Sequence, residues 1–352
     1  FLTETYLSLR KLENRAIGLR FGGQVLMGAF ENPIQVHIGQ FYGIEINDFA
    51  VTVAKTALWI AESQMIAETA AILSQNIDFL PLTTNACIVE GNALRMDWAT
   101  LSDEGQKTGY LYAEKLNIYD AADFEQEGLE LRAPEADITP PAGLPANGLA
   151  DASFFYGRRF KELNVIQRTS EHKKPASPKR TPVSYDYIMG NPPFVGARWM
   201  NRRQKEDVML TFGKDWQGVG DLDYVCCWYK KALDLIRGKA TRCAFVSTNS
   251  VVQGSAVANL WKPLFAAGLH IDFAWRTFRW ENETADRKNM AAVHCVIIGF
   301  STAEDSRPKV IFQNDGQRTV AKNINGYLLD APNIFRAPRK TPPKNLQTNS
   351  NM

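Results

Sequence analysis

Residues 41–65, FYGIEINDFAVTVAKTALWIAESQM, decide the fold class, because they join a short strand to a long helix. The strand, 41–46, is apolar except for Glu45 near its end. Asn47 and Asp48 follow as helix-starting residues, and the next stretch, to about Ala70, is rich in alanine and leucine. A strand that leads directly into a helix is the repeating unit of α/β folds.

The same alternation extends over most of the chain. Helices are predicted at 2–19, 222–237 and 256–267, and strands at 86–90, 185–190, 241–247, 269–275 and 292–300. This order predicts a parallel, doubly wound sheet with right-handed crossovers. Ligands of such sheets bind beyond the carboxyl ends of the strands, where the sequence places Glu45, Asn92, Asn191 and Asn249.

Residues 99–183 differ from the rest of the chain, since they are rich in proline and in charge. We interpret them as an insertion into a core that spans 1–330. Residues 331–352 are polar and contain several prolines and asparagines, and we interpret them as the start of a linker to a further domain.

The bulk composition is that of an ordinary globular protein, with 352 residues, 45% of them hydrophobic and 22% charged. A net charge of +2 is too small to indicate nucleic-acid binding by itself. No apolar run is long enough for a membrane span, and no cysteine and histidine spacing fits zinc, so neither a membrane nor a metal is expected. The cysteines predict buried thiols in a reducing cytoplasm: Cys87, Cys226, Cys227, Cys243 and Cys295.

Asn191-Pro192-Pro193-Phe194 follows the predicted strand 185–190 and carries the candidate chemistry. An exocyclic amine on an aromatic ring is a poor nucleophile, because its lone pair is conjugated with the ring. The Asn191 side-chain carbonyl and the Pro192 backbone carbonyl, held by two prolines, can accept both N–H bonds of such an amine. Phe194 can stack on the ring, and preorganised acceptors stabilise the positive charge that develops. The alternative is a proline-rich turn, since Asn-Pro often opens turns.

The motif and its flanks resemble DNA N6-adenine methyltransferases that use S-adenosylmethionine (SAM). Further segments resemble motifs of that family, in the order of its gamma class: 41–65, 88–98 (IVEGNALRMDW), 221–236 (DLDYVCCWYKKALDLI), 242–254 (RCAFVSTNSVVQG), and 273–283 with 291–300. The chain is most similar to the bacterial restriction–modification polypeptides of Type IIG/IIL, the MmeI-like group. These join nuclease, methyltransferase and specificity domains.

The resemblance implies a class I SAM-dependent methyltransferase fold, which is a Rossmann-like doubly wound sheet. It implies transfer of a methyl group from SAM to N6 of an adenine that is flipped out of double-stranded DNA. A nuclease would lie upstream of this chain and a target-recognition domain downstream.

The resemblance also assigns cofactor-binding residues. Glu45 would accept the ribose hydroxyls of SAM, as acidic residues do at this position of dinucleotide folds. Ile46 would cover the adenine face, with core packing as the alternative. Asn92 stands where many relatives have Asp and would accept the adenine amine, with a turn after Gly91 as the alternative, and Ala93 would add a backbone contact.

On the DNA side, Asn191 and Pro192 would hold the target N6 and Phe194 would stack on the base. Phe278 or Trp280 would form the opposite wall, and we favour Phe278. A loop after the catalytic motif would contact the DNA backbone through Arg198, Arg202, Arg203 and Lys205. For these basic residues, a solvated charged face is the alternative.

The chain departs from the family at its first motif, a glycine-rich loop for which these residues have no counterpart. We interpret Phe1 as the last residue of that motif, so that it would lie beside the cofactor. The first strand, which is central in the family's sheet, and the loop would then be missing. Neighbouring strands would lose their main-chain partners, and we expect this piece alone to bind SAM weakly or not at all.

Two other functions remain open from the sequence. An Asn-Pro-Pro methyltransferase can act on RNA or on a protein glutamine, although such enzymes usually have Tyr after the prolines. A non-catalytic DNA-binding fragment is the second alternative, and it is favoured by the departure at the first motif.

Overall fold

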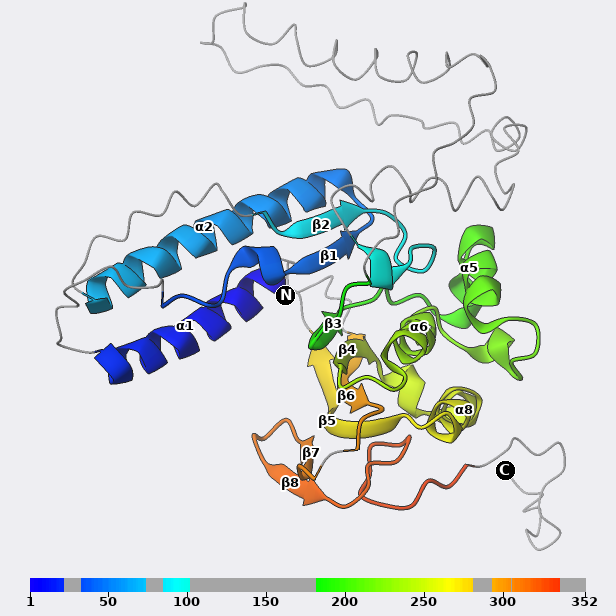
Figure 1. The fold of residues 1–352 in the computed structure, drawn as a ribbon. Coiled ribbons are helices and arrows are strands. Elements are labelled where there is room, and N and C mark those ends of the chain that lie inside the picture. Colours follow the sequence, from blue (N-terminus) through cyan, green and yellow to red (C-terminus); the bar gives the residue numbers. More distant parts are fainter. Residues whose placement is uncertain (22–32, 74–84, 102–181, 281–292, 305, 336–352) are drawn as a thin grey trace, which may run out of the picture. The chain divides into compact units, whose positions relative to one another are not determined.

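The structure is a computed structural model that describes residues 1–21, 33–73, 85–101, 182–280, 293–304 and 306–335 (Figure 1). All of these residues belong to one compact unit, made of Phe1–Leu116 and Pro182–Met352. The elements are described below within this unit alone.

The N-terminal part holds two long helices, α1 (Leu2–Phe21) and α2 (Asp48–Leu73), which pack against each other. Tyr6 and Met65 are buried between them, and the buried guanidinium of Arg10 donates to Thr69 Oγ1 at 2.7 Å. Both helices match the sequence-based predictions. Among the described residues, no helix has the length and apolarity needed to cross a membrane.

Two strands accompany these helices, β1 (Tyr42–Glu45) and β2 (Cys87–Glu90), and they pair in parallel with Glu45 opposite Glu90. Cys87, Ile88 and Val89 are buried. Both strands therefore end at the same edge, as the sequence predicted.

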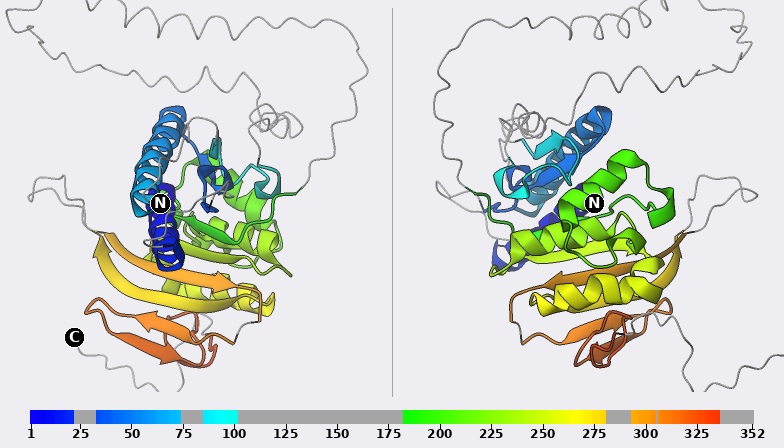
Figure 2. Two further views of the ribbon diagram at one scale, coloured as in Figure 1. Left: turned by 60° about the vertical axis from the view of Figure 1, so that its left-hand side comes forward. Right: turned by 90° about the vertical axis from the view of Figure 1, so that its right-hand side faces the viewer.

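A second sheet has six strands in the order β3-β4-β6-β5-β7-β8 (Figure 2). Their bounds are β3 (Tyr187–Gly190), β4 (Arg242–Thr248), β5 (His270–Trp280), β6 (Val293–Ser301), β7 (Lys309–Phe312) and β8 (Arg318–Ala321). β3 and β4 are parallel, whereas β6 is antiparallel to both of its neighbours, β4 and β5. β7 runs parallel to β5 and antiparallel to β8.

The prediction of a parallel sheet was therefore wrong for β6. Only the short stretch 281–292 separates β5 from β6, and antiparallel neighbours need no helical crossover. Residues 309–312 and 318–321 form strands that the sequence analysis did not predict. Within the described residues no strand joins the β1–β2 pair to β3.

Two helical segments cover one face of this sheet (Figure 2): α6 (Cys226–Ile236) and a run made of α7 (Gly254–Ala256), the π-helix η9 (Val257–Trp261) and α8 (Lys262–Ala266). The helix α5 (Arg202–Phe212) packs against α6. Trp261 is fully buried, and its indole N–H donates to the carbonyl of Val251 at 2.8 Å. The predicted loop after the catalytic motif was wrong from Arg202 onward, because α5 occupies it. The predicted helix 222–237 begins later, at Cys226.

Short 3-10 helices connect these elements: η1 (Ile38–Gln40), η2 (Trp98–Thr100), η6 (Ala197–Trp199), η7 (Val219–Asp221) and η8 (Asn249–Val252). The prediction of buried thiols is confirmed, since all five cysteines are buried and the described residues contain no disulfide.

The predicted insertion falls outside the described residues except at its two ends, and those ends meet. The backbone N–H of Val183 donates to the carbonyl of Ala99 at 2.8 Å. The Tyr185 hydroxyl donates to the carbonyl of Trp98 at 2.6 Å. The chain thus leaves and returns at one point, and the predicted domain boundaries remain predictions.

Candidate functional site

The candidate catalytic loop begins directly after β3, at the carboxyl edge of the six-stranded sheet. Asn191 is exposed, Pro192 is buried and Phe194 is half-buried. The Asn191 side chain makes no hydrogen bond to any part of the chain that the structure describes. A polar group that is exposed and held on a fixed backbone is available to a ligand.

Asp223, in the segment before α6, holds this loop in place through two hydrogen bonds. Its Oδ1 accepts the backbone N–H of Ala197 at 2.8 Å, and its Oδ2 accepts the hydroxyl of Ser250. The next residue, Tyr224, donates its backbone N–H to the carbonyl of Val195 at 2.9 Å. Because these contacts come from a different part of the chain, they hold the loop in one position after it leaves β3.

A cavity of about 370 Å³ lies beside the hydrogen bonds of Asp223. Its lining comes from η8, which follows β4, from the segment between η7 and the start of α6, and from α7 with the residue before it: Asp221, Asp223, Cys226, Ser250, Val251, Gln253, Gly254, Ser255 and Ala256. It therefore lies at the carboxyl edge, where parallel strands usually present ligand sites.

The predicted ribose-binding group, Glu45, ends β1 and is half-buried. Its Oε1 accepts the backbone N–H of Ile46 at 2.9 Å and that of Asn47 at 3.3 Å. Its Oε2 has no hydrogen-bond partner among the described residues. The carboxylate is thus fixed by one oxygen and offers the other to a ligand.

Ile46 is 72% exposed, which excludes the alternative of core packing for this residue. The backbone N–H of Gly91 donates to the carbonyl of Glu45 at 2.9 Å, so the chain after β2 lies against the end of β1. Glu45, Ile46 and Asn92 are therefore brought together at one edge. Phe1 is exposed at the start of α1, and its neighbour Leu2 packs on Gly43 of β1.

Asn92 uses both ends of its amide. Its Oδ1 accepts the backbone N–H of Leu94 at 2.9 Å, which is the turn contact expected of the alternative reading. Its Nδ2 donates to Oδ2 of Asp207, a buried residue of α5, at 2.9 Å. The carbonyl oxygen keeps a second lone pair for a further donor. Ala93 packs on the main core, and its carbonyl accepts the Trp98 indole N–H at 2.8 Å.

Lys231 of α6 packs beside the turn that contains Asn92. Its Nζ donates to the carbonyl of Leu94 at 2.9 Å and lies 5.8 Å from the centre of the Trp98 ring. Burial lowers the pKa of Lys231 from its ordinary value of 10.5 to about 8, although the Asp97 carboxylate opposes this shift.

This depressed pKa predicts a pH-dependent stability. Between pH values of about 8 and 10.5 the folded protein binds fewer protons at Lys231 than the unfolded chain, so the contribution of Lys231 to stability rises with pH. We expect the wild type to become more stable relative to Lys231→Met as the pH rises through this window. Urea unfolding at several pH values measures it, with the exposed Lys239→Met as a control. A constant difference would contradict the burial of the amine.

The predicted opposite wall, Phe278, lies near the carboxyl end of β5, where the pairing with β6 is irregular between Trp275 and Phe278. It is half-buried, with its ring 6.2 Å from that of Trp280. β4 and β6 separate β5 from β3. Phe278 therefore shares an edge with Asn191 without adjoining it, and its role remains a prediction.

The four predicted DNA-contacting residues are exposed, and they lie on η6 and in the first two turns of α5: Arg198, Arg202, Arg203 and Lys205. Arg202 pairs with Glu206 at 3.2 Å, in an exposed i,i+4 pair of little energetic weight. Basic residues at a helix N-terminus oppose the helix dipole. Their position thus favours contact with an anion over a role in helix stability.

Three further residues of the site were not found from the sequence: Asp207, Asp223 and Trp199. Asp223 stood within the quoted segment 221–236, whose resemblance to a family motif was a usable signal. Asp207 lies in the helix that was not predicted. Trp199 follows the loop and is 86% exposed. A large aromatic residue shortly after a catalytic motif could have indicated a contact surface.

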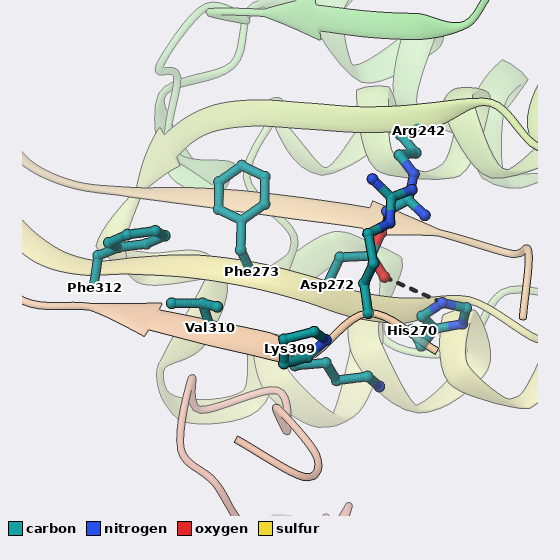
Figure 3. A pocket seen from close by; sticks show the side chains of 9 residues that line it. Arg242, His270, Asp272, Phe273, Lys309, Val310 and Phe312 are labelled. Carbon is teal, nitrogen blue, oxygen red and sulfur yellow. Dashed lines mark hydrogen bonds and ion pairs between the residues drawn. The ribbon is translucent and has the colours of Figure 1, made fainter. Parts of the chain in front are cut away.

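A second cavity of about 370 Å³ extends along β5 and β7 from the opposite, amino edge of the sheet (Figure 3). Arg242, His270 and Lys309 begin β4, β5 and β7 there, and the His270 Nε2 lies 3.1 Å from Oδ1 of Asp272. The predicted site residues do not line it, so it is separate from the catalytic edge.

The mixed sheet, its covering helices and the braced loop after β3 define a class I methyltransferase fold. The family described as "MmeI, DNA-methyltransferase domain" matches residues 1–313. The chain therefore belongs to the family of MmeI-type DNA-methyltransferase domains. This confirms the resemblance that the sequence indicated, apart from the atom that is methylated.

Individual relatives agree with this assignment. The chain is 31% identical, over 97% of its length, to DNA methyltransferase A of Bacillus subtilis (strain 168), and it covers 30% of that protein. It is similar, with a TM-score of 0.67 and 30% identity, to the structure of the Type IIL restriction–modification enzyme MmeI in complex with DNA. That match covers 97% of this chain and 35% of the other. The chain thus spans about a third of the length of these relatives.

Proposed function

We propose that this chain transfers a methyl group from SAM to N6 of an adenine flipped out of duplex DNA, as the methyltransferase part of a restriction–modification enzyme. The observation that carries the proposal is the Asn191 loop. Its amide is exposed and has no partner in the described chain, and Asp223 holds the loop that follows it. The family assignment supports DNA methylation, and the chemistry of the loop supports an amine as the acceptor.

The loop would act on the target amine through two acceptors. Asn191 Oδ1 and the Pro192 carbonyl accept its two N–H bonds, which draws the nitrogen toward a tetrahedral geometry and frees its lone pair. SAM, when bound, supplies an electrophilic methyl carbon. Asn191 and Pro192 would hold the amine while the N–C bond forms as the S–C bond breaks, and the amine proton would then pass to water. Because preorganised acceptors stabilise the developing charge, the loop needs no strong base.

The residues present fit the adenosine half of SAM. The available Oε2 of Glu45 suits the ribose hydroxyls, and the exposed Ile46 side chain suits the adenine face. The second lone pair of Asn92 Oδ1 suits the adenine amine. Phe1, at the start of α1, is proposed for the methionine end of the cofactor.

On the DNA side, Phe194 would stack on the flipped adenine, with Phe278 as the second aromatic candidate. Extrusion of a base costs a few kcal/mol of unstacking, which stacking in the site offsets in part. The exposed basic residues on η6 and α5 would hold phosphates and set the register of the duplex.

A salt titration tests the phosphate contacts. We expect Arg198→Ala to lower the slope of log affinity against log salt concentration by about 1, because each neutralised phosphate releases about one counterion. Arg318→Ala, in the distant strand β8, is the matched control and should leave the slope unchanged. An unaltered slope for Arg198→Ala would assign that residue to a solvated face.

The function itself is tested with the full-length protein, labelled SAM and three acceptors: duplex DNA, structured RNA and a glutamine-containing protein. We expect label in duplex DNA alone, recovered as N6-methyladenine after digestion to nucleosides. Label in N4-methylcytosine would overturn the adenine assignment, and label in RNA or protein would overturn the DNA assignment. Binding of DNA without any transfer would identify a non-catalytic module.

A further inference from the structure

Asp207 is a buried carboxylate that connects three parts of the proposed site. Only 2% of the residue is exposed, and its two oxygens accept three hydrogen bonds from distant side chains. Oδ1 accepts Arg95 Nε at 2.6 Å. Oδ2 accepts Asn92 Nδ2 at 2.9 Å and the Tyr224 hydroxyl at 2.6 Å. Burial and this carboxylate raise the pKa of Tyr224 well above its ordinary range, so its hydroxyl remains a donor.

The Asp207 carboxylate and the backbone N–H of Leu94 together fix which way the Asn92 amide points. An amide presents one donor end and one acceptor end, and an ionised carboxylate only accepts. Asn92 must therefore turn Nδ2 toward Asp207 and Oδ1 away from it. Asn92 with the amide reversed would face Asp207 oxygen to oxygen, which is repulsive in a buried site.

We infer that Asp207 is a positioning residue that selects SAM by its adenine amine, because it holds the Asn92 amide with the oxygen toward the cofactor. The inference rests on the proposed function for the adenine site, and it adds a determinant of cofactor specificity on α5. Arg95 Nε lies 2.6 Å from Oδ1 of Asp207 and compensates the charge of the buried carboxylate.

The same carboxylate also ties the cofactor edge to the catalytic loop. Tyr224, which donates its hydroxyl to Asp207, donates its backbone N–H to the Val195 carbonyl at 2.9 Å. Asn92 and the loop after Asn191 are thus joined through two residues, Asp207 and Tyr224. This network places the donor-binding turn and the acceptor-binding loop in one fixed arrangement.

The test compares two ligands that differ at the purine 6-position. S-adenosylhomocysteine carries a 6-amino donor, whereas S-inosylhomocysteine carries a 6-oxo acceptor at the same place. We expect the full-length wild-type protein to prefer the adenosyl ligand by about tenfold or more, the value of one net hydrogen bond. In Asp207→Asn, the partner amide can donate or accept, so only the backbone N–H of Leu94 still orients Asn92, and the preference should fall several-fold toward 1.

Two variants separate positioning from a loss of folding. Asp215→Asn removes an exposed carboxylate just after α5 and should keep the wild-type preference. The double variant Asn92→Asp, Asp207→Asn exchanges the two side chains. It restores a donor–acceptor pair and turns an oxygen toward the cofactor. It should therefore recover the adenosyl preference, even if Asp207→Asn alone is unstable.

The outcomes are distinct. If Asp207→Asn weakens both ligands equally and keeps their ratio, the residue is structural and the inference is wrong. If the exchange variant folds and shows no preference, the inference is also wrong. If the wild type has no preference, Asn92 does not contact the amine and the inference fails, whereas methylation of duplex DNA by the same protein would leave the proposed function intact.

Discussion

Asn191→Ala is expected to lower the rate of DNA methylation by about 10²–10³-fold, the usual effect of removing one preorganised polar group from a reaction centre. The Asn191 side chain has no partner within the described chain, so its loss should leave the stability of the fold almost unchanged. Single-turnover methylation of duplex DNA at saturating SAM measures the chemical step directly.

Asn333→Ala is the matched control, since it removes an exposed asparagine from the C-terminal part of the described chain. Its rate should equal that of the wild type. If Asn191→Ala methylates DNA at a rate within a few-fold of the wild type, Asn191 is not a catalytic residue. The motif would then be a structural turn.

Asp223→Ala is expected to cause the second-largest decrease in methylation rate, because it removes the hydrogen bonds that hold the catalytic loop. The Ala197 N–H and the Ser250 hydroxyl both lose their acceptor, which costs about 1–3 kcal/mol where such a group stays buried. A displacement of about 1 Å in a reacting group can lower a rate by about 10²-fold, and we expect a decrease of that order in the single-turnover rate.

Asp221→Ala provides the comparison for Asp223→Ala, as both carboxylates line the same cavity and Asp221 takes no part in the hydrogen bonds of Asp223. Asp223→Asn keeps an oxygen acceptor for Ala197 and should fall between the wild type and Asp223→Ala. Equal rates for Asp223→Ala and Asp221→Ala would show that the loop holds its position without Asp223.

Regular apolar patterns made much of the fold predictable from the sequence. α2, β4 and β6 have long apolar runs or clear caps, and their predicted positions agree with the structure. α5 was missed because its sequence, RRQKEDVMLTF, is mostly charged in its first half. β7 and β8 are four residues each, too short for a pattern to emerge.

The candidate site was predictable where a motif is local and not where partners are distant in the sequence. Asn191 to Phe194 form one continuous stretch, so their chemistry could be read directly. Asp207 contacts Asn92 across 115 residues, and Asp223 contacts Ala197 across 26, and no short-range pattern indicates such pairs. For Ile46, the sequence left core packing and ligand contact open, and its exposure excludes core packing.

The backbone hydrogen bond between Ala99 and Val183 has an evolutionary consequence. Where two chain ends are already joined by main-chain contacts, the sequence between them can lengthen at a cost of only about 0.6 kcal/mol for each doubling. This junction can therefore accept, exchange or lose an entire module while the sheet keeps its register. Homologous enzymes should differ most in length here, and a foreign domain grafted at this point should leave the methyltransferase core intact.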